Sequence, residues 1–416
     1  MRARFCLILA GLAILAGSGC SDDAASPTAP VVETAPTVLA SSAALVFRQV
    51  SAGGDHTCGV TTGARAYCWG DNFMGQLGIG AYANQFCMDW DDCVTRPAPV
   101  VGGLRFRVVS AGFRHSCGIT TDDRAYCWGW NMKGALGIGT STGPDICVGN
   151  ESDVWCSTVP VAVLGGLHFR NISVGFSHTC GITIDGLAYC WGQNYSGGLG
   201  DGTTITRLKP RLVAGGLRFA SVSAGGGYTC ALTTEARAYC WGYNGNGELG
   251  DSTHVDRLRP VRVAGGRKFR QLDAGLAHTC GIASDSRAYC WGKGDAGQLG
   301  VGRVLTSFWP RRVAGGLSFD RVTAGDSHTC AEAKDNRAYC WGFNYYGLGD
   351  GTQVKRLAPV LVSGGMLFAQ LAAGSGHTCG LTAVGAVYCW GENRFGQLGD
   401  GTLDFRLTPT AVLGPS

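Results

Sequence analysis

The sequence predicts an all-β fold, a seven-bladed β-propeller built from repeats of about 50 residues. The unit at residues 178–202 recurs seven times, and each copy carries two cysteines ten positions apart, the second followed by Trp-Gly. From copy to copy the first cysteine advances by 59, 63, 50, 50, 50 and 49 residues. A fixed period near 50 is typical of solenoids and propellers, and each copy is long enough for the four antiparallel strands of a propeller blade.

The first 44 residues predict an export signal and a tether. Residues 1–20 have a short basic start, an apolar run over residues 5–16 and small residues before Cys20, which is typical of a secretory signal. The run is too short to span a bilayer as a helix. The cysteine after small residues resembles the lipobox of bacterial lipoproteins, and this resemblance implies acylation of Cys20. Gly17 departs from the lipobox pattern, because an aliphatic residue is usual at its position. Ordinary signal cleavage is the alternative. Residues 21–44 predict a flexible tether, and residues 45–416 the propeller.

The centre of each repeat predicts a β-hairpin, because two runs rich in Thr, Ile, Tyr, Cys and Trp flank a turn. If Cys180 faces Cys190, then Thr183 faces Leu187 and the loop has three residues, with Gly186 last, where a left-handed residue is needed. The cysteines then occupy a non-hydrogen-bonded pair with Cα atoms about 4.5 Å apart, a separation that suits a disulfide.

The number of cysteines supports export to an oxidising compartment. Without Cys6 and Cys20, eighteen remain, an even count with regular local pairing. Zinc sites usually need closely spaced C-x-x-C ligands, which are missing, so we expect no metal. The predicted disulfides are Cys58–Cys68, Cys87–Cys93, Cys117–Cys127, Cys147–Cys156, Cys180–Cys190, Cys230–Cys240, Cys280–Cys290, Cys330–Cys340 and Cys379–Cys389.

Each repeat supplies two more strand candidates, one before the hairpin and one in the Pro-x-x-Val segment after it. The chain begins its first repeat at Phe47 without a clear strand of the second kind, and it ends with one at residues 409–412. We therefore expect the C-terminal strand to close the ring by joining the first blade, which would remove the open edges.

The pattern AG-x-x-HTC-x-LT…AYCWG-x-N-x-x-GQLGDGT resembles the repeats of the regulator of chromosome condensation family, and the resemblance covers the chain after the tether. It implies a seven-bladed propeller. The founding member is a nuclear exchange factor for the GTPase Ran that also binds nucleosomes; relatives include a plant ultraviolet-B receptor and a secreted bacterial β-lactamase inhibitor, so the family does not fix an activity. The export signal argues against guanine-nucleotide exchange, and residues 112–116 match the receptor's G-W-R-H-T too poorly for light sensing.

The low charge of the chain and the recurrence of single residues in the repeats argue against several other functions. The formal charge is +4 and only 15% of residues are charged, so the basic footprint of a nucleic-acid-binding protein is missing. A histidine at the same position in six of the seven repeats indicates structural hydrogen bonding rather than catalysis, and the seven Trp of the YCWG motif indicate packing between blades. The recurring arginines after the hairpin turns indicate solvated surface. The acidic insertion at residues 89–92 lacks an EF-hand pattern, although it leaves calcium open.

We expect binding on one face of the ring. If strands alternate in direction, the loops before the HTC motif, the WG-x-N-x-x-G loops and both cysteine insertions lie on one face, the loop face, while the hairpin turns and Gly-Gly connections lie on the opposite turn face. The copies differ most on the loop face, and aromatic anchors with scattered charge are typical of binding hot spots. The candidate partner-binding residues are Phe73, Trp90, Asp91, Phe113, Arg114, Trp130, Trp155, Phe176, Tyr195, Tyr243, Phe343, Tyr345 and Phe395.

These observations predict a monomeric, non-enzymatic binding protein at the bacterial cell envelope, lipid-anchored at the periplasmic or outer surface, with secretion as the alternative. We expect its partner to be a protein, or alternatively a glycan, and expect no cofactor, no nucleic acid and no membrane contact besides the lipid. The competing class is an enzyme of glycosidase or lyase type at the channel mouth. It would need titratable groups from several blades, and Asp55, Arg114 and Asp326 form a poor constellation.

Overall fold

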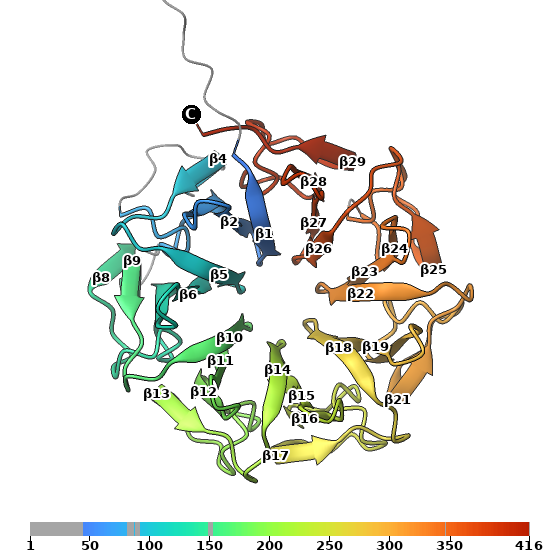
Figure 1. Ribbon diagram of the computed structural model, residues 1–416, viewed down its shortest axis with the longest axis horizontal. Helices are drawn as coiled ribbons and strands as arrows, with labels where there is room; N and C mark the ends of the chain where they lie inside the picture. Colours follow the sequence, from blue (N-terminus) through green and yellow to red (C-terminus); the bar gives the residue numbers. More distant parts are fainter. Residues whose placement is uncertain (1–44, 81–86, 88–91, 149–152, 346, 416) are drawn as a thin grey trace, which may run out of the picture. The chain divides into compact units, whose positions relative to one another are not determined.

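A computed structural model describes residues 45–80, 87, 92–148, 153–345 and 347–415. The strands of this part of the chain form seven antiparallel sheets around a central channel (Figure 1). The predicted seven-bladed all-β propeller is confirmed. In the same ranges no helix is long and apolar enough to cross a membrane.

The strands of each blade follow one another from the channel to the rim. The innermost strands are β1 (Phe47–Ala52), β5 (Phe106–Ala111), β10 (Phe169–Val174), β14 (Phe219–Ala224), β18 (Phe269–Ala274), β22 (Phe319–Ala324) and β26 (Gln370–Ala373). The second strands are β2 (His56–Thr61), β6 (His115–Thr120), β11 (His178–Thr183), β15 (Tyr228–Thr233), β19 (His278–Ala283), β23 (His328–Ala333) and β27 (His377–Leu381). The third strands are β3 (Ala66–Asp71), β7 (Ala125–Trp130), β12 (Ala188–Gly192), β16 (Ala238–Gly242), β20 (Ala288–Gly292), β24 (Ala338–Gly342) and β28 (Val387–Gly391). The fourth strands are β4 (Cys93–Pro99), β9 (Asp153–Ala162), β13 (Arg207–Leu212), β17 (Arg257–Arg262), β21 (Ser307–Arg312), β25 (Arg356–Leu361) and β29 (Arg406–Ala411), and they are the outermost strands in every blade except the second.

The hairpin at the centre of each blade has the predicted register. In the third blade Cys180 pairs with Cys190, and the Thr183 N–H donates to the Leu187 carbonyl oxygen over 2.9 Å. Gly186 has φ +87°, so the loop ends in the left-handed conformation that glycine adopts without strain. The Cα atoms of Cys180 and Cys190 lie 4.1 Å apart. The nine cysteine pairs predicted from the sequence are the nine disulfides of the structure.

The hydrophobic core lies between adjacent blades rather than within one. Between the third and fourth blades, Cys180, Ile182 and Leu199 pack against Phe219 and Trp241. All seven tryptophans of the YCWG motif are fully buried in equivalent positions, which confirms their predicted role in packing between blades. Because each blade covers its neighbour, burial is shared around the ring.

The predicted way of closing the ring is wrong. β29 pairs with β28 inside the last blade, and the first blade has its own outermost strand, β4, which pairs with β3. Each blade is therefore made of consecutive strands, and the C-terminal strand is not a spare one. The first and last blades meet instead through a core cluster in which Phe47, Val50 and Trp69 pack against Leu381 and Leu398. Side-chain hydrogen bonds reinforce this contact.

Among the described residues, the fourth strand of six blades has an unpaired outer edge, and in the second blade β8 (Asp145–Val148) pairs with part of that edge. Each fourth strand carries a proline, which cannot donate to an added strand and so discourages pairing with another chain. The prolines are Pro97, Pro160, Pro210, Pro260, Pro310, Pro359 and Pro409. In the second blade β8 adds a fifth strand beside β9, and the Cys147–Cys156 disulfide joins these two strands.

Candidate functional site

The strand order places the loops as the sequence predicts. Within each blade all pairs are antiparallel, so the connections from first to second strand and from third to fourth strand emerge on the loop face. One Ala-Gly-x or Val-Gly-x segment per blade lines the mouth of the channel there, around a cavity of about 100 Å³. The third residue of this segment differs from blade to blade and is Gly54, Phe113, Phe176, Gly226, Leu276, Asp326 or Ser375.

One part of the mouth is apolar. The rings of Phe113 and Phe176 stack with centroids 4.1 Å apart, and the Arg114 guanidinium lies over Phe113 at 5.5 Å. Phe176 and Leu276 are more than one-third exposed. At Gly226, between them along the ring, a Cβ atom would collide with the Leu276 carbonyl oxygen. Glycine is therefore needed there for the close approach of the two loops, and three large apolar side chains face solvent at the channel mouth.

The other part of the mouth is acidic. Burial, together with the nearby carboxylates Glu392 and Asp326, raises the pKa of Asp55 to about 6. Arg114 and Arg394 oppose this shift. Burial also raises the pKa of Asp326, although a hydrogen bond with Ser375 lowers it. These carboxylates come from the sixth, seventh and first blades, so ring closure assembles them into an acidic arc beside the apolar one.

Glu392 is the site residue that sequence reasoning missed. Its N–H donates to the Gly376 carbonyl oxygen over 2.9 Å, and its carboxylate lies over Gly376, where a Cβ atom would collide with it. The equivalent bond in the first blade joins Asp71 N–H to the Asp55 carbonyl oxygen, also over 2.9 Å. Comparing the residue after Trp-Gly in each copy would have placed Glu392 beside the mouth.

The structure places the predicted partner-binding residues at several depths on the loop face. Half of the described aromatic candidates are exposed, namely Phe176, Tyr195, Tyr243, Phe343 and Tyr345. The half-buried ones are Phe73, Phe113, Trp130, Trp155 and Phe395. Arg114 is exposed, while Trp90 and Asp91 lie outside the described residues. The Phe343 and Tyr345 rings stack with centroids 6.3 Å apart, and Lys133 Nζ lies 5.7 Å from the centre of the Tyr195 ring.

The recurring histidines form a buried belt between blades, behind the glycines that line the channel mouth. Their Nε2 atoms lie 2.7–2.9 Å from the Thr or Ser hydroxyl of the next blade, in the pairs His56–Ser116, His115–Thr179, His178–Thr229, His278–Thr329, His328–Thr378 and His377–Thr57. Thr229 donates its proton to the Gly198 carbonyl oxygen, so its oxygen is left to accept and His178 Nε2 carries the proton. Burial lowers the pKa of these rings to about 3 or about 4, so they are neutral.

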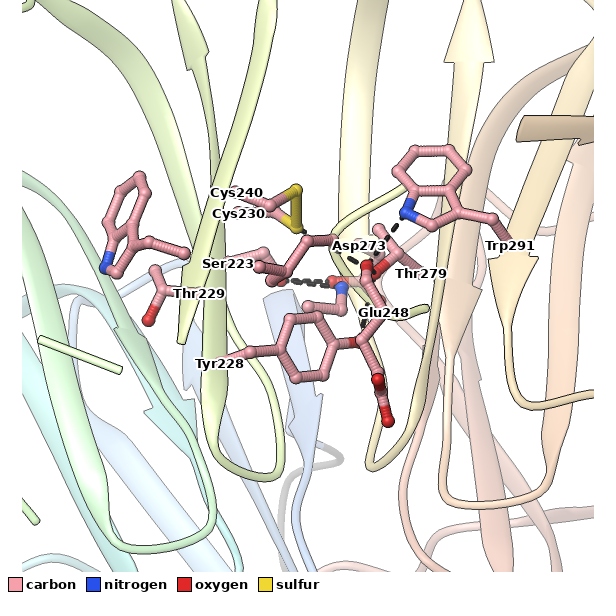
Figure 2. Close-up of a disulfide and its surroundings, with 12 residues drawn as sticks. Ser223, Tyr228, Thr229, Cys230, Cys240, Glu248, Asp273, Thr279 and Trp291 are labelled. Carbon is pink, nitrogen blue, oxygen red and sulfur yellow. Dashed lines mark hydrogen bonds between the residues drawn. A yellow bond between two sulfur atoms is a disulfide. The ribbon is translucent and has the colours of Figure 1, made fainter. Parts of the chain in front are cut away.

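In the fourth blade Tyr228 takes the place of the histidine, and its hydroxyl still forms a hydrogen bond with the next blade. Figure 2 shows the tyrosine hydroxyl directed toward Thr279, beside the Cys230–Cys240 disulfide. Tyr228 donates to the His278 carbonyl oxygen over 2.6 Å and lies 3.0 Å from Thr279 Oγ1. Thr279 and the indole N–H of Trp291 both donate to the Glu248 carbonyl oxygen. The predicted structural role of this position is therefore confirmed.

No metal site is apparent in the described ranges: no group of three or more His, Cys, Asp or Glu side chains is placed to hold an ion. Of the acidic insertion, Asp92 is buried and accepts a hydrogen bond from Asn72 Nδ2 at 2.9 Å. Asp89 and Asp91 lie outside the described residues.

The ring, its buried belt and its variable face together define a β-propeller built from seven sequence repeats. Residues 148–416 match the RCC1-like domain, and residues 47–76 and 106–134 match the regulator of chromosome condensation (RCC1) repeat. The chain belongs to the RCC1-like domain family.

Several known proteins are similar to this chain. The ultraviolet-B receptor UVR8 of Arabidopsis thaliana is 31% identical over 206 residues, 39% of this chain and 45% of the receptor. The chain spans less than half the length of this and the other curated relatives it matches. Human WBSCR16 superposes with a TM-score of 0.70 at 21% identity, covering 81% of this chain and 87% of that one. Yeast RCC1 (Prp20), solved bound to Kap60, gives 0.70 at 20% identity, covering 89% and 85%. Such low identity shows the shared fold alone.

Proposed function

We propose that this chain is an exported, lipid-anchored, non-enzymatic recognition propeller of the cell envelope that binds a protein through its loop face. One observation carries the proposal: a channel mouth divided into an apolar arc and an acidic arc, surrounded by exposed aromatic side chains. Rigid aromatic anchors at low entropic cost are typical of binding hot spots, whereas a solvated surface has no need of them. Yeast RCC1 (Prp20), which shares the fold of this chain, was solved bound to the protein Kap60, and this supports a protein partner.

The chemistry of the mouth indicates the kind of partner. The stacked rings of Phe113 and Phe176 offer apolar surface, and Asp55 offers negative charge in the other part of the mouth, beside the Glu392–Arg394 ion pair. A lysine or arginine side chain has an aliphatic stem and a cationic end, and so matches both. We therefore propose that the partner presents a protruding basic loop, with a glycan as the alternative.

Export and anchoring are supported by the cysteines. Nine disulfides need an oxidising compartment to form and persist. Cys20, which follows the small residues of the signal, is the proposed site of acylation. A secreted, unanchored domain is the alternative location.

One observation favours the enzymatic alternative. A carboxyl with a pKa raised to about 6, as in Asp55, is what a glycosidase requires of its general acid, and Glu392 or Asp326 would be the second carboxylate. If this alternative holds, purified protein releases reducing ends from envelope polysaccharide and Asp55→Asn abolishes the release. If recognition holds, no release occurs.

Photo-crosslinking in the cell tests the recognition proposal. p-Benzoylphenylalanine replaces Tyr195, Tyr243 or Phe343 on the loop face, one at a time. Controls in the same three blades place it at the exposed turn-face positions Ile184, Thr234 and Lys334. We expect one recurring protein adduct from the loop-face set. The same protein captured only from the turn-face set would overturn the proposal.

A further inference from the structure

The turn face is strongly basic. Many of its cationic side chains have no carboxylate within ion-pair distance among the described residues, namely Arg48, Arg65, Arg105, Arg170, Arg218, Arg267, Lys268, Arg287 and Lys334. Others form ion pairs there, namely Arg107, Arg124, Arg237, Arg270 and Arg337. Among the described residues of this face, Asp185 and Asp285 are exposed acids that form no ion pair with an arginine. These cations are scattered along the sequence, but in the structure they lie on one face of the ring.

Several of these cations are held in place by backbone carbonyls. Arg48 donates to the Phe106 carbonyl oxygen over 2.7 Å, and Arg105 donates to that of Gly63 over 2.6 Å. Arg170 donates in the same way to Phe219 in the next blade. A carbonyl orients a guanidinium without neutralising it, so the positive charge stays on the surface.

Exposed apolar side chains lie among the cations. Val384, at the hairpin tip of the last blade, is 80% exposed, and Ile184, at the tip of the third, is 61% exposed. Leu367 and Val46 are about half exposed on the same face. Apolar side chains among basic ones are typical of proteins that bind the interface of an anionic bilayer, where the former enter the headgroup region. A nucleic-acid backbone offers no such apolar layer.

The chain enters the propeller at this same face. The Phe47 N–H donates to the Gly385 carbonyl oxygen over 2.9 Å, and the Val46 carbonyl accepts from the Thr62 N–H over 2.9 Å. Residue 46 therefore lies between the hairpin turns of the first and last blades. A tether that precedes residue 45 must attach on the turn face.

We propose that the turn face docks onto the anionic surface of a lipid bilayer and so points the loop face away from it. The acidic arc at the channel mouth on the opposite face assists, because an anionic surface repels it. The orientation toward the membrane rests on the proposed lipid anchor, whereas the affinity of the face for anionic lipid does not. This docking adds a second membrane contact to the acyl chain expected at Cys20.

The test uses the full chain made without acylation as Cys20→Ser. Its co-sedimentation is measured with vesicles of phosphatidylcholine containing phosphatidylglycerol, and with phosphatidylcholine alone, at low and high salt. We expect binding to the anionic vesicles only, weakened by salt. The variant Arg65→Gln/Lys268→Gln/Lys334→Gln removes side chains that form no hydrogen bond or ion pair with any described residue, and it should bind about 100-fold more weakly, at about fivefold per charge.

The matched control is Lys209→Gln/Arg303→Gln/Lys355→Gln, which removes three exposed charges elsewhere. It should keep affinity within about threefold, because charges beyond a Debye length contribute little. Val384→Asn should weaken binding several-fold without changing the salt dependence. No binding to anionic vesicles, or equal losses in the two triple variants, would overturn the proposal. So would equally tight binding to duplex DNA with the same dependence on the variants. Failure here leaves the loop-face adducts of the crosslinking experiment unaffected, and the reverse also holds.

Discussion

His377 of the last blade lies with its Nε2 atom 2.8 Å from the Oγ1 atom of Thr57 in the first, and this hydrogen bond joins residues 320 positions apart. The Thr57 hydroxyl donates a hydrogen bond to the Gln397 carbonyl oxygen, which also accepts a hydrogen bond from the indole N–H of Trp69. Equivalent histidine bonds link five other pairs of adjacent blades. The ring therefore closes by the same side-chain contacts that join the blades elsewhere, without a shared strand.

The junction between the last and first blades lacks one bond that the others have. On the innermost strands, the Ser51 hydroxyl accepts from the Ala111 N–H of the next blade over 3.0 Å, and Thr323 does the same for Ala373. Ala372 holds this position in the last blade and has no hydroxyl to offer Ala52. Ala372 lines the channel, so a serine side chain has room there.

We expect Ala372→Ser to raise the free energy of unfolding by about 1 kcal/mol in urea titrations. Ser51→Ala, the reverse change at an intact junction, should lower it, and a loss of stability in Ala372→Ser would contradict this explanation.

Acid should destabilise the fold through the buried histidines. Burial lowers the pKa of His56, His115, His278 and His377 to about 3, and of His178 and His328 to about 4. The unfolded rings titrate near 6.5, so the unfolded chain binds more protons below that pH, and stability is full above it and falls as pH decreases.

At pH 5 each histidine with a folded pKa of about 3 should cost about 2 kcal/mol. Five carboxyls have pKa values raised by burial and act in the opposite direction, namely Asp55, Glu248, Asp273, Asp326 and Glu332. We expect the six histidines, at about 2 kcal/mol each, to outweigh them. Urea titrations at pH 7.5 and pH 5 check this prediction. A protein more stable at pH 5 would show that the histidine belt is not neutral in the folded state.

The disulfides should be oxidised in the exported protein. Peptide mass mapping without reductant should recover all nine pairs, and free hairpin cysteines would contradict the prediction. Replacing Cys180 and Cys190 by serine should cost about 2–3 kcal/mol, because the bridge closes a short loop in the unfolded chain. The ring should survive, since each blade also packs on its neighbours.

Much of the fold could be predicted from the sequence because repetition averages out local ambiguity. The cysteine spacing predicts the hairpin register, and a histidine at the same position in six of the seven copies indicates a structural role. The repeat gives no information about where a blade begins, however, so an outermost strand can be assigned either to its own repeat or to the next. Pairing of β4 with β3 decides this in the structure.

The site was harder to predict for the same reason. Asp55 and Glu392 lie at opposite ends of the domain sequence and meet only because the ring closes. The arginines after the hairpin turns each look like ordinary solvated residues, and their common face becomes visible only when seven turns are placed side by side.

The lipid anchor gives a direct prediction about Cys20. In cell fractionation, Cys20→Ala should move the protein from the membrane pellet to the soluble fraction after a high-salt wash, which removes electrostatic contacts of the turn face. The unsubstituted protein should stay in the pellet. Equal membrane recovery of both after the wash would show that no acyl chain anchors the protein.

The most direct test of recognition by the loop face compares two side chains of the third blade. Tyr195 on the loop face and Ile184 on the turn face are both 61% exposed, so neither substitution disturbs the core. The measurement is the affinity of the crosslinked partner for Tyr195→Ala and Ile184→Ala by calorimetry, with thermal melts to confirm folding. We expect Tyr195→Ala to cost about 2 kcal/mol and Ile184→Ala to change nothing measurable. A loss in Ile184→Ala with full affinity in Tyr195→Ala would contradict the account.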